Sequence, residues 1–292
     1  MTRIRRSVAL ARASWGVLRQ EPGLAVLPVL SAVVSLAVVG VVGVAVWLTL
    51  GRDTGADGTA TATANVATWL LVAVGYVAVA FVQTAFLAAL CIGANERLSG
   101  RDTDLREALA RVRPHLHRIL GWAVVAATVS FVLQAVEARF EALGRVLARL
   151  LGAAWAVVTF LVVPVIVFED AGPGRALRRS GSLLAATWGE NLTAQVGFGI
   201  LGFLAALPAL VLGTVGAASG IVAIAVVAVA VAVVWLVVVA AVLAALSGIY
   251  RSALYRYAVD GQVPAAFGDV DLAHAFGPTR RTGPGPSPTL WS

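Results

Sequence analysis

One stretch limits this chain's fold more than any other: residues 191–250 hold no charged side chain in sixty positions. A soluble domain carries about 25% charged residues. A single helix of that length would measure ~90 Å, roughly three times the thickness of the hydrocarbon core of a bilayer. The Gly-rich segment 213–220 predicts a reversal in the middle. The stretch therefore predicts two membrane-spanning helices, at 191–212 and 221–250.

Four further apolar runs approach or exceed the ~20 residues that a helix needs to cross a bilayer. They predict spans at 24–50, 66–94, 119–136 and 150–168. The first is longer than the apolar region of a signal peptide, and no clear small-residue cleavage site follows it. With 60% hydrophobic residues in the whole chain, the predicted fold is all-α, a polytopic membrane protein with six transmembrane helices.

Three basic segments precede spans and have an apolar stripe at helical spacing, with arginines on another face. They lie at about 3–20, 101–118 and 175–189 and predict amphipathic helices in the membrane interface. The side of the membrane that receives them collects 18 of the 22 arginines. Because basic residues concentrate in cytoplasmic segments, this side is predicted to be cytoplasmic, together with both termini.

The unit of basic helix, span, turn and span occurs three times, at 1–98, 99–171 and 172–262. One explanation is tandem duplication, as in transporters built from repeats. The other is that any hairpin entering from the cytoplasm gains from a leading basic helix, and both stay open. We expect a single membrane domain over 1–276. The Pro-, Gly- and Ser-rich tail 277–292 is expected to be disordered and cytoplasmic.

A motif appears twice in nearly the same form. Arg178-Arg179-Ser180-x-x-Leu183-x-x-Ala186-Thr187-Trp188-Gly189 matches Arg5-Arg6-Ser7-x-x-Leu10-x-x-Ala13-Ser14-Trp15-Gly16. Arginine can fork onto a phosphate, and tryptophan favours the membrane interface. Two interpretations stay open: a surface helix held by carboxylate–guanidinium pairs, or a seat for an anionic phospholipid head group. The candidate residues for this interface are Arg175, Arg178, Arg179, Trp188, Glu169, Arg5, Arg6 and Trp15.

No catalytic constellation stands out. The chain has no lysine, so it lacks a phosphate-loop signature and a Schiff-base residue. Gly197-x-Gly199-x-x-Gly202 matches the dinucleotide fingerprint by letter, but it lies in an apolar run without a preceding strand and suits close helix packing. His115 and His117 diverge on a helix, whereas zinc needs converging ligands. We predict no catalytic residue, no cofactor and no metal site, and do not expect an enzyme.

The predicted spans contain no Asp, Glu, Arg or His. Gln83 and Gln134 are their most polar members, and each suits either a helix–helix hydrogen bond or a substrate contact. The absence of a buried carboxylate counts against a proton-coupled transporter. Pro28, Pro164 and Pro208 can kink spans and free backbone carbonyls, which suits a broken-helix site, although proline at a helix entry or in a packed bundle is commoner.

The chain resembles a known family in three places. These are Val163-Pro164-x-x-x-Phe168-Glu169, the Arg178-Arg179-Ser180 motif and the exit Ile249-Tyr250-Arg251-x-Ala253-Leu254-Tyr255-Arg256-Tyr257-Ala258. It resembles an uncharacterised family of bacterial and archaeal six-span membrane proteins, catalogued as a domain of unknown function, over about residues 1–276. The resemblance implies a multi-pass protein of the cell (inner) membrane and no catalytic residues.

More loosely, the pattern of Pro, Glu and then Arg-Ser before a span is similar to the membrane domain that accompanies some glycerophosphodiester phosphodiesterases. The Glu, Asp and His set of their catalytic domain cannot be assembled from this chain.

The sequence thus predicts a non-enzymatic integral membrane protein, a scaffold or lipid-associated component of the envelope. The alternative is a transporter or permease component that moves a lipid or small molecule. The net charge of +7 could suggest nucleic acid. Because the arginines flank apolar spans, membrane lipids, anionic phospholipid in particular, are the expected partners, and nucleic acid is not.

Overall fold

The computed structural model describes residues 14–16, 23–53, 62–102, 104–139, 141–187 and 191–261, and within these ranges it contains helices and turns but no strand. The all-α prediction is confirmed for this part of the chain. The helices are α2 (Gly23–Asp53), α3 (Ala62–Leu98), α4 (Leu105–Val112), the 3₁₀ turn η1 (Arg113–His115), α5 (Leu116–Arg139), α6 (Glu141–Val158), α7 (Val162–Phe168), α8 (Pro173–Thr187), α9 (Asn191–Ala218) and α10 (Val222–Asp260).

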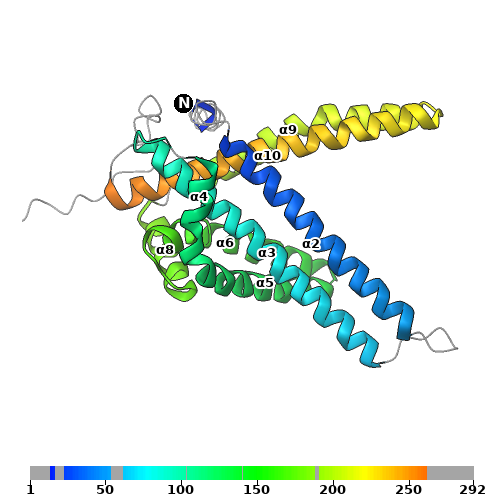
Figure 1. Ribbon diagram of the computed structural model, residues 1–292, viewed down its shortest axis with the longest axis horizontal. Helices are drawn as coiled ribbons and strands as arrows, with labels where there is room; N and C mark the ends of the chain where they lie inside the picture. Colours follow the sequence, from blue (N-terminus) through cyan, green and yellow to red (C-terminus); the bar gives the residue numbers. More distant parts are fainter. Residues whose placement is uncertain are drawn as a thin grey trace, which may run out of the picture.

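Three long helical hairpins fan out from one common end of the molecule (Figure 1). They are formed by α2 with α3, α5 with α6, and α9 with α10, and the short helices α4 and α8 lie at the common end. Five segments are long and apolar enough to cross a membrane: Gly23–Thr49, Val66–Leu98, Leu105–Glu137, Val146–Phe168 and Val222–Asp260. These lengths fit a multi-pass membrane protein. The apolar part of α9 measured in the same way, Gly202–Gly216, is shorter.

The three predicted interfacial helices agree with the structure to different degrees. The segment predicted at 101–118 is shorter, because α4 begins at Leu105 and η1 follows at Arg113–His115. Pro114 lies inside η1, where its missing N–H and its ring favour a tighter turn over a regular α-helix. The helix α8 covers most of the predicted 175–189. Of the predicted 3–20, only Ser14–Gly16 is described, and it is helical. The tail 277–292 lies outside the described residues.

The fourth predicted span, 150–168, is not one continuous helix. α6 ends at Val158, a turn follows at 159–161, and α7 begins at Val162. Pro164 explains the break, because its ring would clash with the carbonyl four residues earlier, at Phe160, in an unbroken helix. The sequence pattern predicts only a kink at Pro164, not an interruption of the helix.

Ser180 of α8 closes this break. Its hydroxyl donates to the carbonyl oxygen of Val158 at 2.6 Å and accepts the N–H of Leu161 at 3.2 Å. Ser180 is completely buried, so without it both backbone groups would lose their partner away from water. The Arg-Arg-Ser motif therefore has a structural serine at its centre.

The chain reverses only at the end of the predicted segment 213–220. α9 continues through Ala218, and the chain turns at Ser219 and Gly220, whose φ of +69° favours glycine. Gly216 instead lets two helices approach, since a Cβ there would lie 2.2 Å from the Cβ of Ala228 on α10. α10 also runs ten residues past the predicted end of the sixth span at residue 250, to Asp260.

Gly202, the last glycine of the dinucleotide-like motif, lies inside α9. A Cβ there would lie 2.8 Å from a methyl carbon of Leu243. The motif is therefore part of a helix that packs closely on another helix. It lacks the strand and turn that a dinucleotide site requires.

The core lies at the common end, where α3, α7, α8 and α10 converge. Its largest fully buried side chains include Leu90, Ile119, Leu161, Ile166, Tyr250 and Leu254. α3 runs through the middle and packs against α2, α5, α7 and α10. Away from this end the hairpins expose rows of valines and leucines, such as Val222, Val226 and Val227 on α10. Such surfaces are stable where lipid surrounds them.

We predict that Ser180→Ala lowers the free energy of unfolding by about 1–3 kcal/mol, because a buried carbonyl and a buried N–H lose their partner. Chemical denaturation in mixed micelles measures this. Ser182→Ala is the matched control: its hydroxyl donates to the carbonyl of Arg179 at 2.8 Å on the same helix, and a change below about 0.5 kcal/mol is expected. Equal effects of the two variants would contradict the role assigned to Ser180.

Candidate functional site at the polar end of the helices

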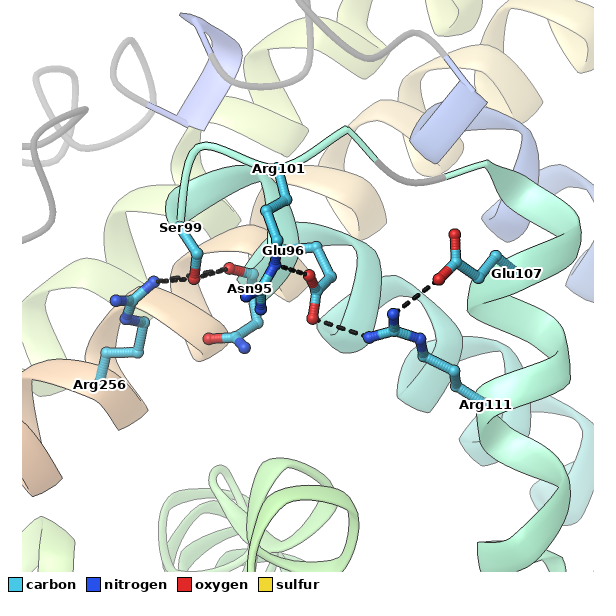
Figure 2. Close-up of polar contacts among 7 residues, drawn as sticks. All are labelled: Asn95, Glu96, Ser99, Arg101, Glu107, Arg111 and Arg256. Atoms are coloured by element: carbon cyan, nitrogen blue, oxygen red, sulfur yellow. Dashed lines mark hydrogen bonds and ion pairs between the residues drawn. The ribbon is translucent and has the colours of Figure 1, made fainter.

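The charged side chains of the common end form two clusters. The first, shown in Figure 2, centres on Glu96 at the end of α3, which is only 6% exposed. Its carboxylate accepts hydrogen bonds from Nε of Arg101 and, at 2.8 Å, from Nη1 of Arg111. Nη2 of Arg111 also donates to Glu107 at 2.6 Å. Glu96 thus joins the end of α3 to α4, which carries Arg111 and Glu107.

The same cluster extends to α10. Nη1 of Arg256 donates to the hydroxyl of Ser99 at 2.8 Å and to the carbonyl of Asn95 at 3.5 Å, as Figure 2 shows. Nearby, the hydroxyl of the fully buried Ser252 donates to the carbonyl of Cys91 at 3.1 Å. Since these bonds link segments far apart in the sequence, the first cluster holds three helix ends together.

The second cluster lies where α7 turns into α8. Nε of Arg179 donates to the carboxylate of Glu169 at 3.0 Å, and the hydroxyl of Tyr255 on α10 donates to the same oxygen at 3.2 Å. Glu169 therefore ties α8 and α10 together through one carboxylate.

Asp170 makes the remaining bonds of this cluster. Its backbone has a φ of +51°, uncommon for a residue other than glycine. Its carboxylate pairs with Arg118 and lies 3.1 Å from Nδ1 of His115, while its carbonyl accepts a bond from Arg175 at 2.9 Å. His115 thus contacts a carboxylate, and within the described ranges no three side chains of His, Cys, Asp or Glu converge on a metal position.

The structure gathers only part of the predicted interface. Glu169, Arg175 and Arg179 come together in the second cluster, and the Glu169–Arg179 pair fits the interpretation of a surface helix held by ion pairs. Arg178 lies exposed on α8, and none of the described carboxylates pairs with it. Trp15 is described and 47% exposed. Arg5, Arg6 and Trp188 lie outside the described residues.

The Glu96 cluster was missed by the sequence analysis. The sequence predicts only that the second span ends at residue 94, two positions before Glu96. Pairing of Glu96 with Arg111, fifteen residues later, depends on the turn at Ser99–Gly100, which folds α4 back along α3. The available signal was a carboxylate at the end of an apolar run, followed by arginines on an amphipathic helix.

Two hollows flank α3 within the apolar region. One, of about 400 Å³, is lined by α2, α3 and α10, and the other, of about 420 Å³, by α3, α5, the α6–α7 segment and α10. Gln83, Leu87 and Arg251 line both. Of the two roles open to Gln83, its position at a hollow favours contact with a bound molecule. Arg251 was placed just beyond the sixth span by the sequence analysis, and its link to Gln83 could not be seen there.

Comparisons with known proteins give one finding. A family model described as a family of unknown function (DUF6159) matches residues 61–265. No curated protein and no solved structure shows significant similarity to the chain. The resemblance to a domain of unknown function is confirmed over this range. The looser similarity to the membrane domain of glycerophosphodiester phosphodiesterases stays a prediction.

We predict that Glu96→Gln lowers the free energy of unfolding by about 1 kcal/mol. The reason is that the guanidinium groups of Arg101 and Arg111 lose the carboxylate charge that both of them contact. Glu107→Gln is the matched control. It removes a contact of Arg111 whose carboxylate side chain is 49% exposed, and a change below about 0.5 kcal/mol is expected. Thermal unfolding in one detergent at several salt concentrations measures both. A larger effect of Glu107→Gln would contradict the central place of Glu96.

Proposed function

The chain belongs to the DUF6159 family of unknown function, and from this premise we propose that it is a six-span, non-enzymatic protein of a bacterial or archaeal inner membrane that binds anionic phospholipid head groups at its cytoplasmic face. It serves there as a scaffold or lipid-associated component of the envelope.

The hairpin of α9 and α10 supports six spans. α9 has 28 residues, which gives a length of ~42 Å, enough to cross the hydrocarbon core. It packs on α10, and the two meet closely at Gly216 and Ala228. Because α10 is long and apolar enough to cross a membrane, we place the helix that packs along it in the membrane as well. An even number of spans places the described end at Asp260 on the same side as the start of α2.

The observation that carries the lipid proposal is a set of exposed arginines without a carboxylate partner. At the common end of the hairpins, within the described part of the chain, these are Arg106, Arg113, Arg175 and Arg178, on α4, η1 and α8. Both helices lie at the common end of the hairpins (Figure 1). Arg101, Arg111, Arg118 and Arg179, by contrast, each pair with a carboxylate. Unpaired guanidinium groups at a membrane interface suit phosphate, which they can bind through two parallel hydrogen bonds.

The use of the carboxylates supports a non-enzymatic role. Glu96, Glu169 and Asp170 each contact at least one arginine and join separate helices. A carboxylate that acts as a general base must lie within hydrogen-bond reach of a substrate proton, whereas these three are engaged in contacts that hold the helices together.

We predict that replacing Arg106, Arg113, Arg175 and Arg178 together by Gln lowers the retention of anionic phospholipid by about tenfold or more. The reason is the loss of four cations that attract the head group, each worth ~1 kcal/mol near an anionic surface. Native mass spectrometry of protein purified in mild detergent, with mixed phosphatidylglycerol and phosphatidylcholine, measures the bound lipid.

Arg149→Gln is the matched control, because Arg149 is an exposed arginine of α6 outside both clusters. It is expected to retain lipid like the wild type. Equal retention of both lipids by the wild-type protein, or unchanged retention by the fourfold variant, would refute binding by these arginines.

The hollows beside Gln83 favour one second candidate, a transporter or permease component for a lipid or small molecule. A membrane cavity with a polar side chain is the kind of site that transporters use. We predict that, if the protein moves lipid, proteoliposomes exchange a fluorescent short-chain phospholipid between leaflets faster than empty vesicles. Gln83→Leu should slow this exchange. Identical rates in the two kinds of vesicle would exclude this candidate for the lipid tested.

A further inference from the structure

We propose that Arg251 and Gln83 bind the head of an anionic single-chain amphiphile, a carboxylate or a phosphate monoester, whose apolar chain lies in the hollow between α2, α3 and α10. This site is separate from the surface arginines, and it stands whether or not these bind phospholipid.

Arg251 differs from the paired arginines of the polar end. Its Nε–H is buried without a hydrogen-bond partner, and the centre of its guanidinium lies 4.5 Å from the centroid of the Phe160 ring. Among the described residues no carboxylate pairs with it. A guanidinium in apolar surroundings is costly unless an anion or several acceptors meet it, and one aromatic ring supplies only part of that. An unpaired intramembrane cation is by default a candidate binding group.

The depth of Arg251 indicates what kind of ligand it meets. It lies five residues before Arg256, which bonds Ser99 at the polar end, and this corresponds to ~7.5 Å along the helix. A phospholipid in the surrounding leaflet keeps its head group at the interface, beside the surface arginines. A ligand whose charge reaches Arg251 has therefore entered the protein.

The hollow of about 400 Å³ suits an apolar chain that continues from this charge. Its volume lies within the ~300–1,000 Å³ of ordinary ligand pockets. Along α10 it extends from Arg251 back to Val237, fourteen residues and thus ~21 Å. Most of its lining is apolar, for example Val29, Phe86 and Leu90. Burying an alkyl chain there is favourable, in proportion to the apolar surface that is removed from water.

The second hollow is less suited to an alkyl chain. Its wall includes Trp122 and Trp155, which stack with ring centroids 5.8 Å apart, and the polar residues Thr84, Ser130 and Thr159. We therefore place the chain in the hollow lined by α2, α3 and α10, and the charged head where the two hollows meet. At that junction the guanidinium can fork onto two oxygens of the anion, and the amide of Gln83 can donate a further bond.

The test compares three probes that share one chain length: dodecanoate, dodecyl phosphate and 1-dodecanol. Native mass spectrometry of the full chain in a non-ionic detergent measures their binding. We expect at least one of the two anions to bind about tenfold or more tightly than the alcohol, since a charge-assisted hydrogen bond exceeds the 1.4 kcal/mol of a tenfold change. Comparing dodecanoate with dodecyl phosphate identifies the head group. Dodecanol binding as tightly as both anions would overturn the proposal.

Two substitutions, Arg251→Gln and Arg251→Met, test the charge. Both should abolish the preference for the anion, with a thermal stability equal to or above that of the wild type, because a buried cation without a partner is removed. Arg256→Gln is the matched control five residues later on α10, where the guanidinium bonds Ser99 instead of lining a hollow, and it should keep the preference. A preference that survives in Arg251→Met would overturn the assignment of the site.

A second pair of variants tests the position of the chain. Ala244 lines the hollow between α2, α3 and α10, and Ala126 lines the other. Ala244→Leu should weaken binding of the anion about tenfold by filling the space, while Ala126→Leu should leave it unchanged. The opposite result would overturn the placement of the chain. The surface variant with four Gln substitutions should keep this binding, so a failure of the surface site and a failure of the Arg251 site give different results.

Discussion

The arrangement of the polar end depends on how the break between α6 and α7 is closed. Pro164 prevents a continuous helix, and the freed groups of Val158 and Leu161 meet the hydroxyl of Ser180. This contact joins α8 to the break in the helix before it. The next turn of the chain, between α7 and α8, presents Glu169 and Asp170 to α10, α5 and α8. One buried serine thus connects an interruption in an apolar helix to the placement of a charged cluster.

The arginines of this protein occur in three environments, and each environment implies a different use. Some pair with carboxylates and fasten helix ends together, as Arg111 and Arg179 do. Others, such as Arg178, lie exposed without a carboxylate from the described part of the chain and suit phosphate at a membrane surface. Arg251 alone among the described arginines lines both hollows beside α3. A count of arginines predicts the orientation of the chain but does not separate these uses.

Sequence patterns predicted the helices better than they predicted their interruptions. The first two spans, 24–50 and 66–94, agree with α2 and α3, because long apolar runs leave the backbone few ways to satisfy its hydrogen bonds in lipid. The reversal expected over 213–220 is confined to its last two residues, because α9 continues through Ala218. Glycines there had been taken as turn residues, whereas Gly216 permits close packing of α9 on α10. In a helical hairpin glycine can serve either purpose, and local sequence does not distinguish them.

The sequence by itself determined the class of fold and the end at which charge collects, since both follow from where apolar runs begin and end. It also identified Glu169, Arg175 and Arg179 as neighbours, because they lie within eleven positions of one another. Only the tertiary structure decided that Glu96 meets Arg111, and that Arg251 shares two hollows with Gln83, 168 positions away. Such pairings depend on which helices pack together and in what register, and the apolar faces that settle this are nearly uniform in Val, Ala and Leu.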